Sequence, residues 1–359
     1  MFKGSVASED LGQVVRALKS AAEPTRLRLL VLLSHGELTV TELCRVLGQS
    51  QPRISRHLRV LTEAGFLDRF REQQSVYYRA PVRGRPLEWL RQILSMTHPD
   101  TTLLRRDREC ALQVVRQRAD VAAQQLSLTD AEGAVSWRDS RATPGLASGR
   151  TAREEISAVL LEELGPASIG ELLDIGTGSG LMIEILGPRA EHAVGIDISA
   201  PALRLARTRV HGAGLSHCEF RRGDMYSLAS EDRAVDTVTI ERVLATAERP
   251  VAAIAEAARV LRQSGRLVVI EDFEQVAAHA PDNPLAQLRR WLASGGFDAV
   301  RLRPCDLSTR HVIVAVARLE GAPASALRDS LRGPDGIVVD TPNTGSQPNT
   351  ASQANAGSS

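Results

Sequence analysis

The sequence is poor in aromatic residues, lysine and paired cysteines, and each shortage restricts what the chain can be. Aromatic residues make up 3% of its 359 positions although 43% of the residues are hydrophobic, so its cores must consist mainly of Leu, Val, Ile and Ala. Lysine occurs only as Lys3 and Lys19, which excludes a Schiff-base lysine from the second half of the chain. The four cysteines stand far apart with no Cys-x-x-Cys pair, and this spacing favours a reduced cytoplasmic protein over a disulfide framework.

Long apolar runs and a strong net charge are also lacking. No run approaches the length of a membrane span, and the N-terminal residues do not resemble a secretory signal, so we expect no membrane contact. The net charge of +1 hides an asymmetry. Lys and Arg outnumber Asp and Glu by 20 to 14 over residues 1–130 and are outnumbered by 29 to 24 in the remainder. A basic N-terminal part is typical of proteins that bind a polyanion.

Short helices followed by a β-hairpin are predicted in the first 97 residues. Apolar residues at helical spacing and breaks at Gly36, Gly48 and Gly65 define the helices. Thr39 and Glu42 have the spacing of a capping box at a helix start. The predicted helices cover residues 10–20, 24–33, 40–47 and 51–64, and the predicted strands cover 66–70 and 75–79. This order predicts a winged helix-turn-helix.

The helix over Gln51–Ala64 has the composition of a DNA-recognition helix. Ile54, Leu58 and Leu61 share one face and can be buried, whereas polar and arginine side chains occupy the rest. Such side chains near the start of a second helix suit contacts with base edges and phosphates. The predicted DNA-binding residues, the last of them in the hairpin, are Ser50, Gln51, Arg53, Ser55, Arg56, His57, Arg59 and Arg71.

Residues 10–95 resemble the ArsR family of dimeric bacterial repressors. The resemblance lies in AAEPTRLRLLVLL, in LTVTELCRVLGQSQPRISRHLRVLTEAGFL and in YYR of the second predicted strand. It implies a homodimer that binds palindromic, double-stranded operator DNA. Metal-sensing members carry two cysteines in an ELCVCD-type box, whereas the corresponding segment Glu42–Leu47 has Cys44 alone. We therefore expect a DNA-binding domain over residues 1–97 with no metal site.

Two segments lie outside the predicted domains. Residues 98–150 predict a connector, with an arginine-rich helix over about 100–127 and a linker or lid over 129–150. Residues 321–359 are rich in Gly, Pro, Ser, Thr, Asn and Gln and predict a disordered tail, in which only Ala326–Leu331 has a helical pattern.

Residues 151–320 alternate β-prone and helical segments. The predicted strands cover residues 171–175, 193–196, 218–221, 235–240 and 267–271, with helices such as 200–211 and 251–261 between them, and 298–303 with 311–318 form a closing hairpin. Strands that alternate with helices predict a doubly wound parallel sheet. The expected fold class is therefore a two-domain α/β protein, a winged helix-turn-helix followed by a Rossmann-like domain with a terminal β-hairpin.

The segment Leu172–Gly180 (LLDIGTGSG) is a glycine-rich loop between an apolar strand and a helix. Glycine lets the backbone turn sharply and approach a ligand, and the N–H groups of the following helix point into the same space. The dinucleotide fingerprint Gly-x-Gly-x-x-Gly fails because Leu181 and Ile183 stand where its last glycine is needed, and no P-loop Gly-Lys-Ser/Thr follows. The loop predicts a nucleotide-type ligand of another class.

The second half resembles class I S-adenosylmethionine-dependent methyltransferases over residues 150–318. The segments are ELLDIGTGSGLMIEIL, AVGIDIS, FRRGDMYSL, VDTVTIERVL and AARVLRQSGRLVVIEDF, in this order. The resemblance implies that S-adenosylmethionine or its product S-adenosylhomocysteine binds here, with the methionine moiety at the glycine loop, the ribose at Asp197, the adenine at Asp224 and Met225, and the transfer site near Glu241. The ligand-binding residues that it implies are Asp174, Gly176, Thr177, Gly178, Gly180, Asp197, Ile198, Asp224, Met225 and Glu241.

Residues suited to methyl-transfer chemistry are few. The segment after Ile240 lacks the Asn/Asp-Pro-Pro-Tyr/Phe that an amino-methylating DNA enzyme has there, and Cys305 falls in the terminal hairpin rather than at the position of a cytosine C5 nucleophile. The candidate catalytic bases are Glu241 and Tyr226, while His279 is expected to be a loop residue. The sequence leaves open whether the chain is an enzyme.

Two functions are compatible with the two halves, which together resemble fused ArsR–methyltransferase regulators. The first is a cytoplasmic transcriptional regulator in which the adenosyl ligand is an allosteric signal, transmitted by the helices of residues 86–127. The second is an active methyltransferase of a small-molecule acceptor whose DNA-binding domain regulates its own expression.

Overall fold

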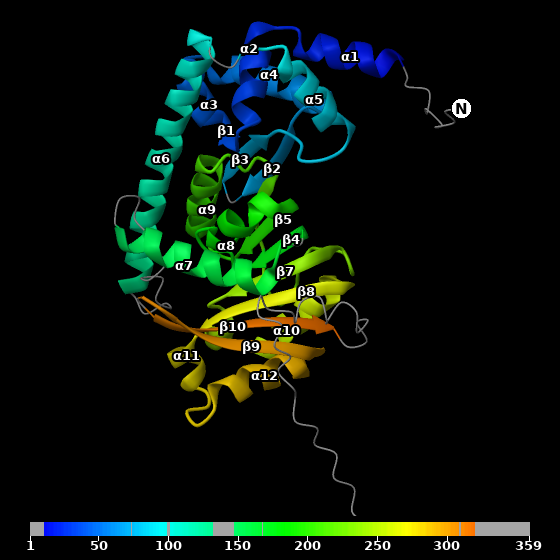
Figure 1. Ribbon diagram of the computed structural model, residues 1–359. Helices are drawn as coiled ribbons and strands as arrows, with labels where there is room; N and C mark the ends of the chain where they lie inside the picture. Colours follow the sequence, from blue (N-terminus) through cyan, green and yellow to red (C-terminus); the bar gives the residue numbers. More distant parts are fainter. Residues whose placement is uncertain are drawn as a thin grey trace, which may run out of the picture.

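The computed structural model describes residues 11–72, 74–98, 101–131, 147–166, 168–308 and 310–319. The tail expected at 321–359 and residues 132–146 of the expected linker lie outside these ranges. In Figure 1 an N-terminal domain lies above a C-terminal domain, and the long helix α6 (Thr102–Ala131) runs along both. The two-domain α/β architecture is as predicted.

The N-terminal domain is a winged helix-turn-helix. Its elements are α1 (Leu11–Ala21), α2 (Pro24–Leu33), β1 (Leu38–Thr39), α3 (Val40–Leu47), α4 (Gln51–Glu63), β2 (Asp68–Glu72), β3 (Ser75–Arg79) and α5 (Arg85–Ser95). The strands form an antiparallel sheet in the order β1-β3-β2. Thr39 and Glu42 form the predicted capping box at the start of α3, and Gly48, at a left-handed φ of 64°, ends that helix. The turn at Gly48 lets α4 begin after Ser50.

The core of this domain is aliphatic, as the shortage of aromatic residues requires. Ile54, Leu58 and Leu61 of α4 are fully buried and pack in one cluster with Leu43 of α3. Their spacing leaves the opposite side of α4 exposed.

Helices α6 and α7 (Ala147–Leu164) connect the domains, and α7 begins before the boundary expected at residue 151. Helix α6 packs against α2 and α3 of the N-terminal domain and against α9 (Ala200–Gly212) of the C-terminal domain. Arg28 of α2 donates to both oxygens of Asp107 in α6, at 2.6 and 2.7 Å. This buried pair fixes α6 to the N-terminal domain.

The C-terminal domain is a seven-stranded sheet in the order β6-β5-β4-β7-β8-β10-β9. Strands β4 to β8 are parallel, and the terminal hairpin β9–β10 is antiparallel, as predicted. Its remaining elements are β4 (Gly170–Ile175), α8 (Leu181–Leu186), the 3₁₀ turn Gly187–Arg189, β5 (Ala190–Asp197), β6 (Cys218–Arg222), β7 (Val235–Glu241), the 3₁₀ turn Leu244–Thr246, α10 (Pro250–Val260), β8 (Leu261–Asp272), α11 (Phe273–Ala277), α12 (Pro284–Ser294), β9 (Phe297–Leu307) and β10 (Arg310–Leu319).

Helices cover both faces of this sheet, so its strands are buried on both sides. Leu173 of β4 packs in the cluster that contains α10 and α12, whereas its neighbour Leu172 packs in the cluster that contains α7, α8 and α9. Successive side chains along a β-strand point to opposite faces of the sheet, so β4 has apolar side chains on both faces. Strand β8 is longer than predicted: the polar run after Leu261 resembles a turn in the sequence, but Leu261 pairs with Val235 of β7.

Candidate functional site

The predicted ligand residues gather at the carboxyl ends of β4, β5 and β7. Asp174, Asp197 and Glu241 lie at these ends, and the three strands are neighbours in the sheet. Strands β5 and β6 extend the sheet on one side of β4, and β7 and β8 extend it on the other side. Open α/β sheets bind ligands at the switch point between two such neighbouring strands, here β4 and β7.

The glycine loop has a backbone that only glycine adopts easily. Gly176, Gly178 and Gly180 have φ angles of 69°, 52° and 81°. A Cβ atom on Gly176 would also lie 2.4 Å from Cγ2 of Val243. The loop passes directly into α8, so backbone N–H groups at the start of this helix border the same space. This cradle of bare backbone fits the close approach of a ligand.

Asp197 holds the glycine loop and the start of α9 together. Its Oδ2 accepts a hydrogen bond from the Gly178 N–H at 2.8 Å, and its Oδ1 accepts one from the Ser199 N–H at 2.7 Å. Burial raises the pKa of this carboxyl, while the backbone N–H groups of Ser199, Gly178 and Ile198 oppose that rise. A carboxylate has about four acceptor sites, so Asp197 retains acceptor capacity for a ligand hydroxyl. The neighbouring Ile198 is exposed.

Asp174 is a buried acid with spare acceptor capacity. Its Oδ1 accepts a hydrogen bond from the Thr239 hydroxyl at 2.6 Å, whereas its Oδ2 has no hydrogen-bond partner among the described residues. Burial raises the pKa of Asp174 to about 7, and the charges of Glu241 and Asp197 act in the same direction. A ligand cation would satisfy the second oxygen and stabilise the ionised form.

Glu241 belongs to an ion-pair cluster at the carboxyl ends of β7 and β8. Nη2 of Arg310 lies 3.5 Å from Oε1 of Glu241, and Nη1 of Arg310 lies 3.7 Å from Oδ1 of Asp272. Asp272 also accepts from Nε of Arg242 at 2.8 Å, and Arg242 has a left-handed φ of 55°. Sequence reasoning missed Arg310, because only the antiparallel pairing of β10 with β8 brings it to this edge.

Glu271 is a second residue beside the candidate site that sequence reasoning missed. Its Oε1 accepts hydrogen bonds from the N–H groups of Val243 and Leu244 at 2.9 and 2.6 Å. Burial raises the pKa of Glu271 to about 7. This acid therefore anchors the segment after Glu241 against the sheet. An acid inside an apolar strand, VVIED, was its only signal in the sequence.

The residues after β6 have mostly structural partners. Asp224 is exposed and accepts a hydrogen bond from the Tyr226 N–H at 2.9 Å, and the half-buried Met225 packs against the main core cluster. The N–H of Arg249 donates to the Tyr226 hydroxyl at 3.2 Å, and its guanidinium lies 4.5 Å from the ring centroid. His279 binds the Ala245 carbonyl through Nε2 at 2.7 Å. The Tyr226 hydroxyl accepts the Arg249 N–H, so its own proton is not used in this hydrogen bond.

The outer face of α4 is polar and basic. Its exposed side chains, with that of the preceding Ser50, include Gln51, Arg53, Ser55, Arg56 and Arg59. His57 lies apart from them: it is half-buried, with Nδ1 3.5 Å from Oε2 of Glu23. Burial lowers the pKa of His57. The structure thus gives His57 a partner inside the domain, whereas the arginines face outward.

The two faces of the hairpin β2–β3 have different surroundings. Arg71, paired with Val76, is exposed on one face. Phe70 pairs with Tyr77 on the other face, where the two rings stack at 5.5 Å and Tyr77 is buried. That inner face packs against the C-terminal domain, a contact that the sequence did not predict (Figure 1).

The described residues contain no group of three or more His, Cys, Asp and Glu side chains that could hold a metal ion. Within the same ranges, no helix is both long and apolar enough to cross a membrane.

In comparison with known protein families, one segment in each half of the chain matches a family. Residues 23–69 match the family described as "Bacterial regulatory protein, arsR family", and residues 173–269 match the family described as "Methyltransferase domain". The chain joins an arsR-type regulatory domain to a methyltransferase domain. Both recognised resemblances are thereby confirmed.

Individual relatives each match only part of the chain. The arsR-type domain is 47% identical over 66 residues to the arsenical resistance operon repressor of Escherichia coli, which covers 18% of this chain and 56% of that protein. The match to the arsenite methyltransferase of Halobacterium salinarum is 29% identical over 160 residues and covers 39% of this chain and 40% of that protein. An uncharacterised 37.1 kDa protein in transposon TN4556 of Streptomyces fradiae is 33% identical over 152 residues, covering 41% and 42%. The chain thus spans about half the length of these relatives.

Proposed function

We propose that this protein is a transcriptional regulator in the cytoplasm whose affinity for operator DNA depends on an adenosyl ligand bound to its methyltransferase domain. The observation that carries the proposal is the shared interface of the two domains. The arsR-type hairpin has one face against the methyltransferase domain, while the basic face of α4 points outward. Ligand binding and DNA binding therefore act on one connected body.

The proposed ligand is S-adenosylmethionine or S-adenosylhomocysteine, held at the carboxyl edge of the sheet. The glycine loop surrounds the methionine moiety with Gly176, Thr177, Gly178 and Gly180. The ammonium group of this moiety suits Oδ2 of Asp174, which has no hydrogen-bond partner among the described residues. Asp197 accepts from the ribose hydroxyls. The adenine contacts Asp224, Met225 and the exposed Ile198, and Glu241 lies nearest the methyl group.

The proposed DNA contacts are made by α4 and the outer face of the hairpin. Arg53, Arg56 and Arg59 bind phosphates or guanine edges, Ser50, Gln51 and Ser55 add polar contacts, and Arg71 follows the backbone.

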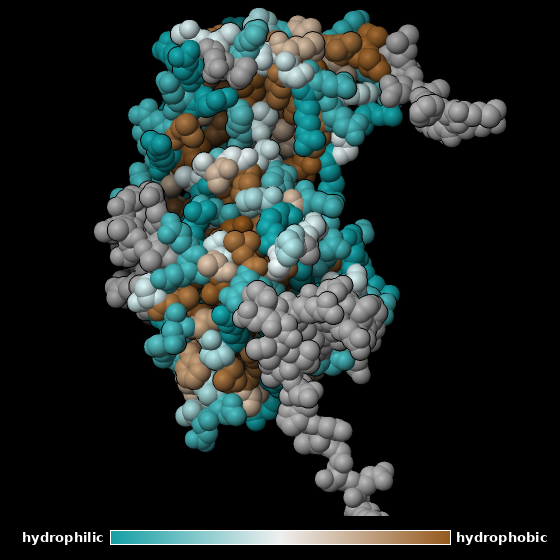
Figure 2. Space-filling view, viewed as in Figure 1, coloured by the Kyte–Doolittle hydropathy of each residue, from teal (hydrophilic) through white to brown (hydrophobic). Residues whose placement is uncertain are grey.

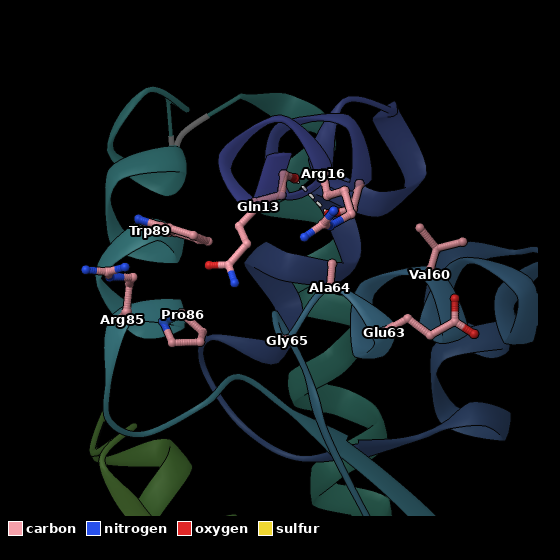
Figure 3. A pocket seen from close by; sticks show the side chains of 11 residues that line it. Gln13, Arg16, Val60, Glu63, Ala64, Gly65, Arg85, Pro86 and Trp89 are labelled. Carbon is pink, nitrogen blue, oxygen red and sulfur yellow. Dashed lines mark hydrogen bonds between the residues drawn. The ribbon is translucent and has the colours of Figure 1, made fainter. Parts of the chain in front are cut away.

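We propose that the protein forms a homodimer through the exposed side of α1. Val15 and Leu18 of α1 are 39% and 53% exposed, and Figure 2 shows hydrophobic residues gathered over this helix. A groove of about 600 Å³ between α1, α4 and α5 contains apolar and charged side chains side by side, among them Arg16, Glu63 and Trp89 (Figure 3). Charges of both signs beside apolar surface suit a two-fold contact with a second copy. Sedimentation should give a dimer for the wild type and a monomer for Leu18→Glu; a dimer in both would contradict this interface.

Fluorescence anisotropy with a labelled duplex tests the regulatory proposal. The duplex is selected from a random pool for binding to the full chain, and its dissociation constant is measured with and without saturating S-adenosylmethionine or S-adenosylhomocysteine. A coupling free energy of about 1–3 kcal/mol would change the affinity about 5- to 150-fold. Unchanged affinity with both ligands would sink the proposal.

The second proposed function is methyl transfer to a small-molecule acceptor. It is favoured by the half-buried acid Glu241 at the carboxyl end of β7 and by the similarity to an arsenite methyltransferase. Bound S-adenosylmethionine would supply the methyl group. Burial raises the pKa of Glu241, which suits a residue that takes a proton from the acceptor. Production of S-adenosylhomocysteine with cell-extract metabolites, abolished in Asp197→Ala, would support it. No product above the level of that variant would exclude it for those metabolites.

A further inference from the structure

A buried ion-pair cluster joins the hairpin of the arsR-type domain to the methyltransferase domain. Its centre is Arg207 of α9, whose side chain is fully buried. Nε of Arg207 pairs with Glu37, which precedes β1, and Nη2 lies 2.6 Å from Oε2 of Glu72 at the end of β2. The same Nη2 donates to the Phe220 carbonyl of β6 at 2.8 Å. One side chain thus binds two acids of one domain and the backbone of the other.

A second arginine crosses the interface in the opposite direction. Arg79 of β3 lies 2.7 Å from Oε2 of Glu219 in β6 and 3.3 Å from Oε1 of Glu37. Both acids are buried. Glu37 therefore pairs with one arginine from each domain. The guanidinium of Arg207 also lies 5.0 Å from the centroid of the Tyr77 ring.

Helix α9, which carries Arg207, begins at the ligand end of the sheet. Its N-cap Ser199 donates its N–H to Asp197, whose other oxygen holds Gly178. Farther along the helix, the Ala206 Cβ would lie 3.0 Å from a Cβ on Gly180, and Nη1 of Arg209 donates to the Ser179 hydroxyl at 2.9 Å. Arg207 lies between these last two contacts in the sequence. The helix therefore touches the glycine loop and the hairpin at once.

The far end of α9 meets the same part of the arsR-type domain. Nε2 of His211 accepts the Glu37 N–H at 3.4 Å, and burial lowers the pKa of His211 to about 3, so the ring is a neutral acceptor. Along α9, the Thr208 hydroxyl lies 3.4 Å from the Val115 carbonyl of α6.

Buried charges make this interface intolerant of small displacements. A buried arginine or carboxylate that loses its charged partner is strongly unfavourable, so the geometry that keeps Arg207 beside Glu37 and Glu72 is preferred. A shift of α9 would leave Glu37 and Glu72 without Arg207. Such an interface changes between discrete arrangements rather than sliding continuously.

We infer that the Arg207 cluster is the coupling element, through which ligand contacts at the glycine loop and Asp197 are transmitted by α9 to the hairpin and thus to DNA affinity. Arg207 is a positioning residue, since it reaches neither ligand nor DNA. The inference rests on the proposed function and names its route. That route differs from the helices of residues 86–127 that the sequence suggested.

The test compares the coupling ratio, defined as the dissociation constant for the selected duplex without S-adenosylmethionine divided by that with saturating S-adenosylmethionine. In Arg207→Met the ratio should move to within twofold of one, whichever direction it has in the wild type, while calorimetry gives a dissociation constant for S-adenosylmethionine within threefold of wild type. A variant that folds, binds both ligands and keeps the wild-type ratio would overturn the inference.

Two further variants protect the test against misfolding. The triple change Glu37→Gln, Glu72→Gln and Arg207→Met removes all three charges together, so no buried acid keeps a charge that Arg207 would have paired. The second variant, Glu72→Gln alone, removes one charge and keeps the size of that side chain. Both should bring the ratio closer to one. The matched control is Arg303→Met, which breaks the ion pairs of Arg303 with Glu162 and Glu163 inside the methyltransferase domain and should keep the ratio. A wild-type ratio of one with S-adenosylmethionine and likewise with S-adenosylhomocysteine would refute the proposed function and the inference together, whereas a wild-type ratio retained by the triple variant would refute the inference alone.

Discussion

Asp197 has two tasks at the residue scale. Its two oxygens already accept backbone N–H groups from the glycine loop and from the start of α9. A ribose that adds two hydroxyl donors would complete the carboxylate's hydrogen bonding without displacing either. The same side chain thus shapes the ligand site and links it to α9.

Replacing Asp197 with Ala should therefore weaken adenosyl-ligand binding. Hydrogen bonds to a charged group contribute about 1.5–3 kcal/mol, so we expect affinity for S-adenosylmethionine to fall by about 10- to 150-fold in calorimetry. The exposed loop residue Asp282 supplies the control, because Asp282→Ala should bind as wild type. Equal affinity of both variants would remove Asp197 from the site.

The pKa of Asp174, raised to about 7 by burial, predicts a pH dependence of stability. Between its ordinary pKa of 3.8 and about 7, the folded protein holds a proton that the unfolded chain has released. The contribution of this carboxyl to the unfolding free energy is therefore fully present below about pH 4 and falls by about 1.4 kcal/mol per pH unit until about pH 7. In urea denaturation, Asp174→Asn should gain stability relative to wild type as the pH rises through this window. A difference that stays constant from pH 4 to 8 would contradict the assignment.

The exposed arginines of α4 should determine the salt dependence of DNA binding. Arg53→Ala and Arg56→Ala should each weaken binding of the selected duplex and lower the slope of log affinity against log salt by about one for each phosphate that the variant no longer binds. Arg289→Ala, on an exposed position of α12, is the control and should leave both quantities unchanged. Wild-type affinity and slope in both α4 variants would show that another surface binds DNA.

At the scale of elements, the glycine loop predicts a contrast between two substitutions. Gly176→Ala places a Cβ at a φ of 69° and against Val243, so it should lower the unfolding free energy by about 1–3 kcal/mol and weaken ligand binding. Gly212→Ala, near the end of α9 with no neighbour within 4 Å, should raise stability by about 0.5–1 kcal/mol. Urea denaturation measures both, and a neutral Gly176→Ala would argue against a tight loop.

Local pattern predicted most elements but not the contacts between them. The capping box of Thr39 and Glu42, the strands that carry Asp174 and lead to Asp197, and the terminal hairpin are each encoded within a few neighbouring residues, so the sequence was enough. Glu72 and Arg207 meet only because the two domains fold against each other, and no local spacing marks such a pair. Arg310 likewise depends on sheet register.

At the scale of the whole molecule, the proposed ligand site and the interface with the arsR-type domain lie at opposite ends of the strands of the methyltransferase sheet. The ligand residues follow the carboxyl ends of β4 and β5, whereas Glu171 and Glu219, at the amino ends of β4 and β6, pair with arginines of the arsR-type domain and its following loop. Helix α9 runs between these ends. The central claim is therefore that the ligand site and the DNA-binding surface share one free energy of coupling.

The reciprocal calorimetric titration tests this claim most directly. S-adenosylmethionine is titrated into the full chain alone and into the chain saturated with the selected duplex. Thermodynamic linkage requires the two dissociation constants to differ by the same factor, about 5- to 150-fold, as that by which the ligand changes DNA affinity. Identical dissociation constants with and without DNA would contradict the coupling of the two sites.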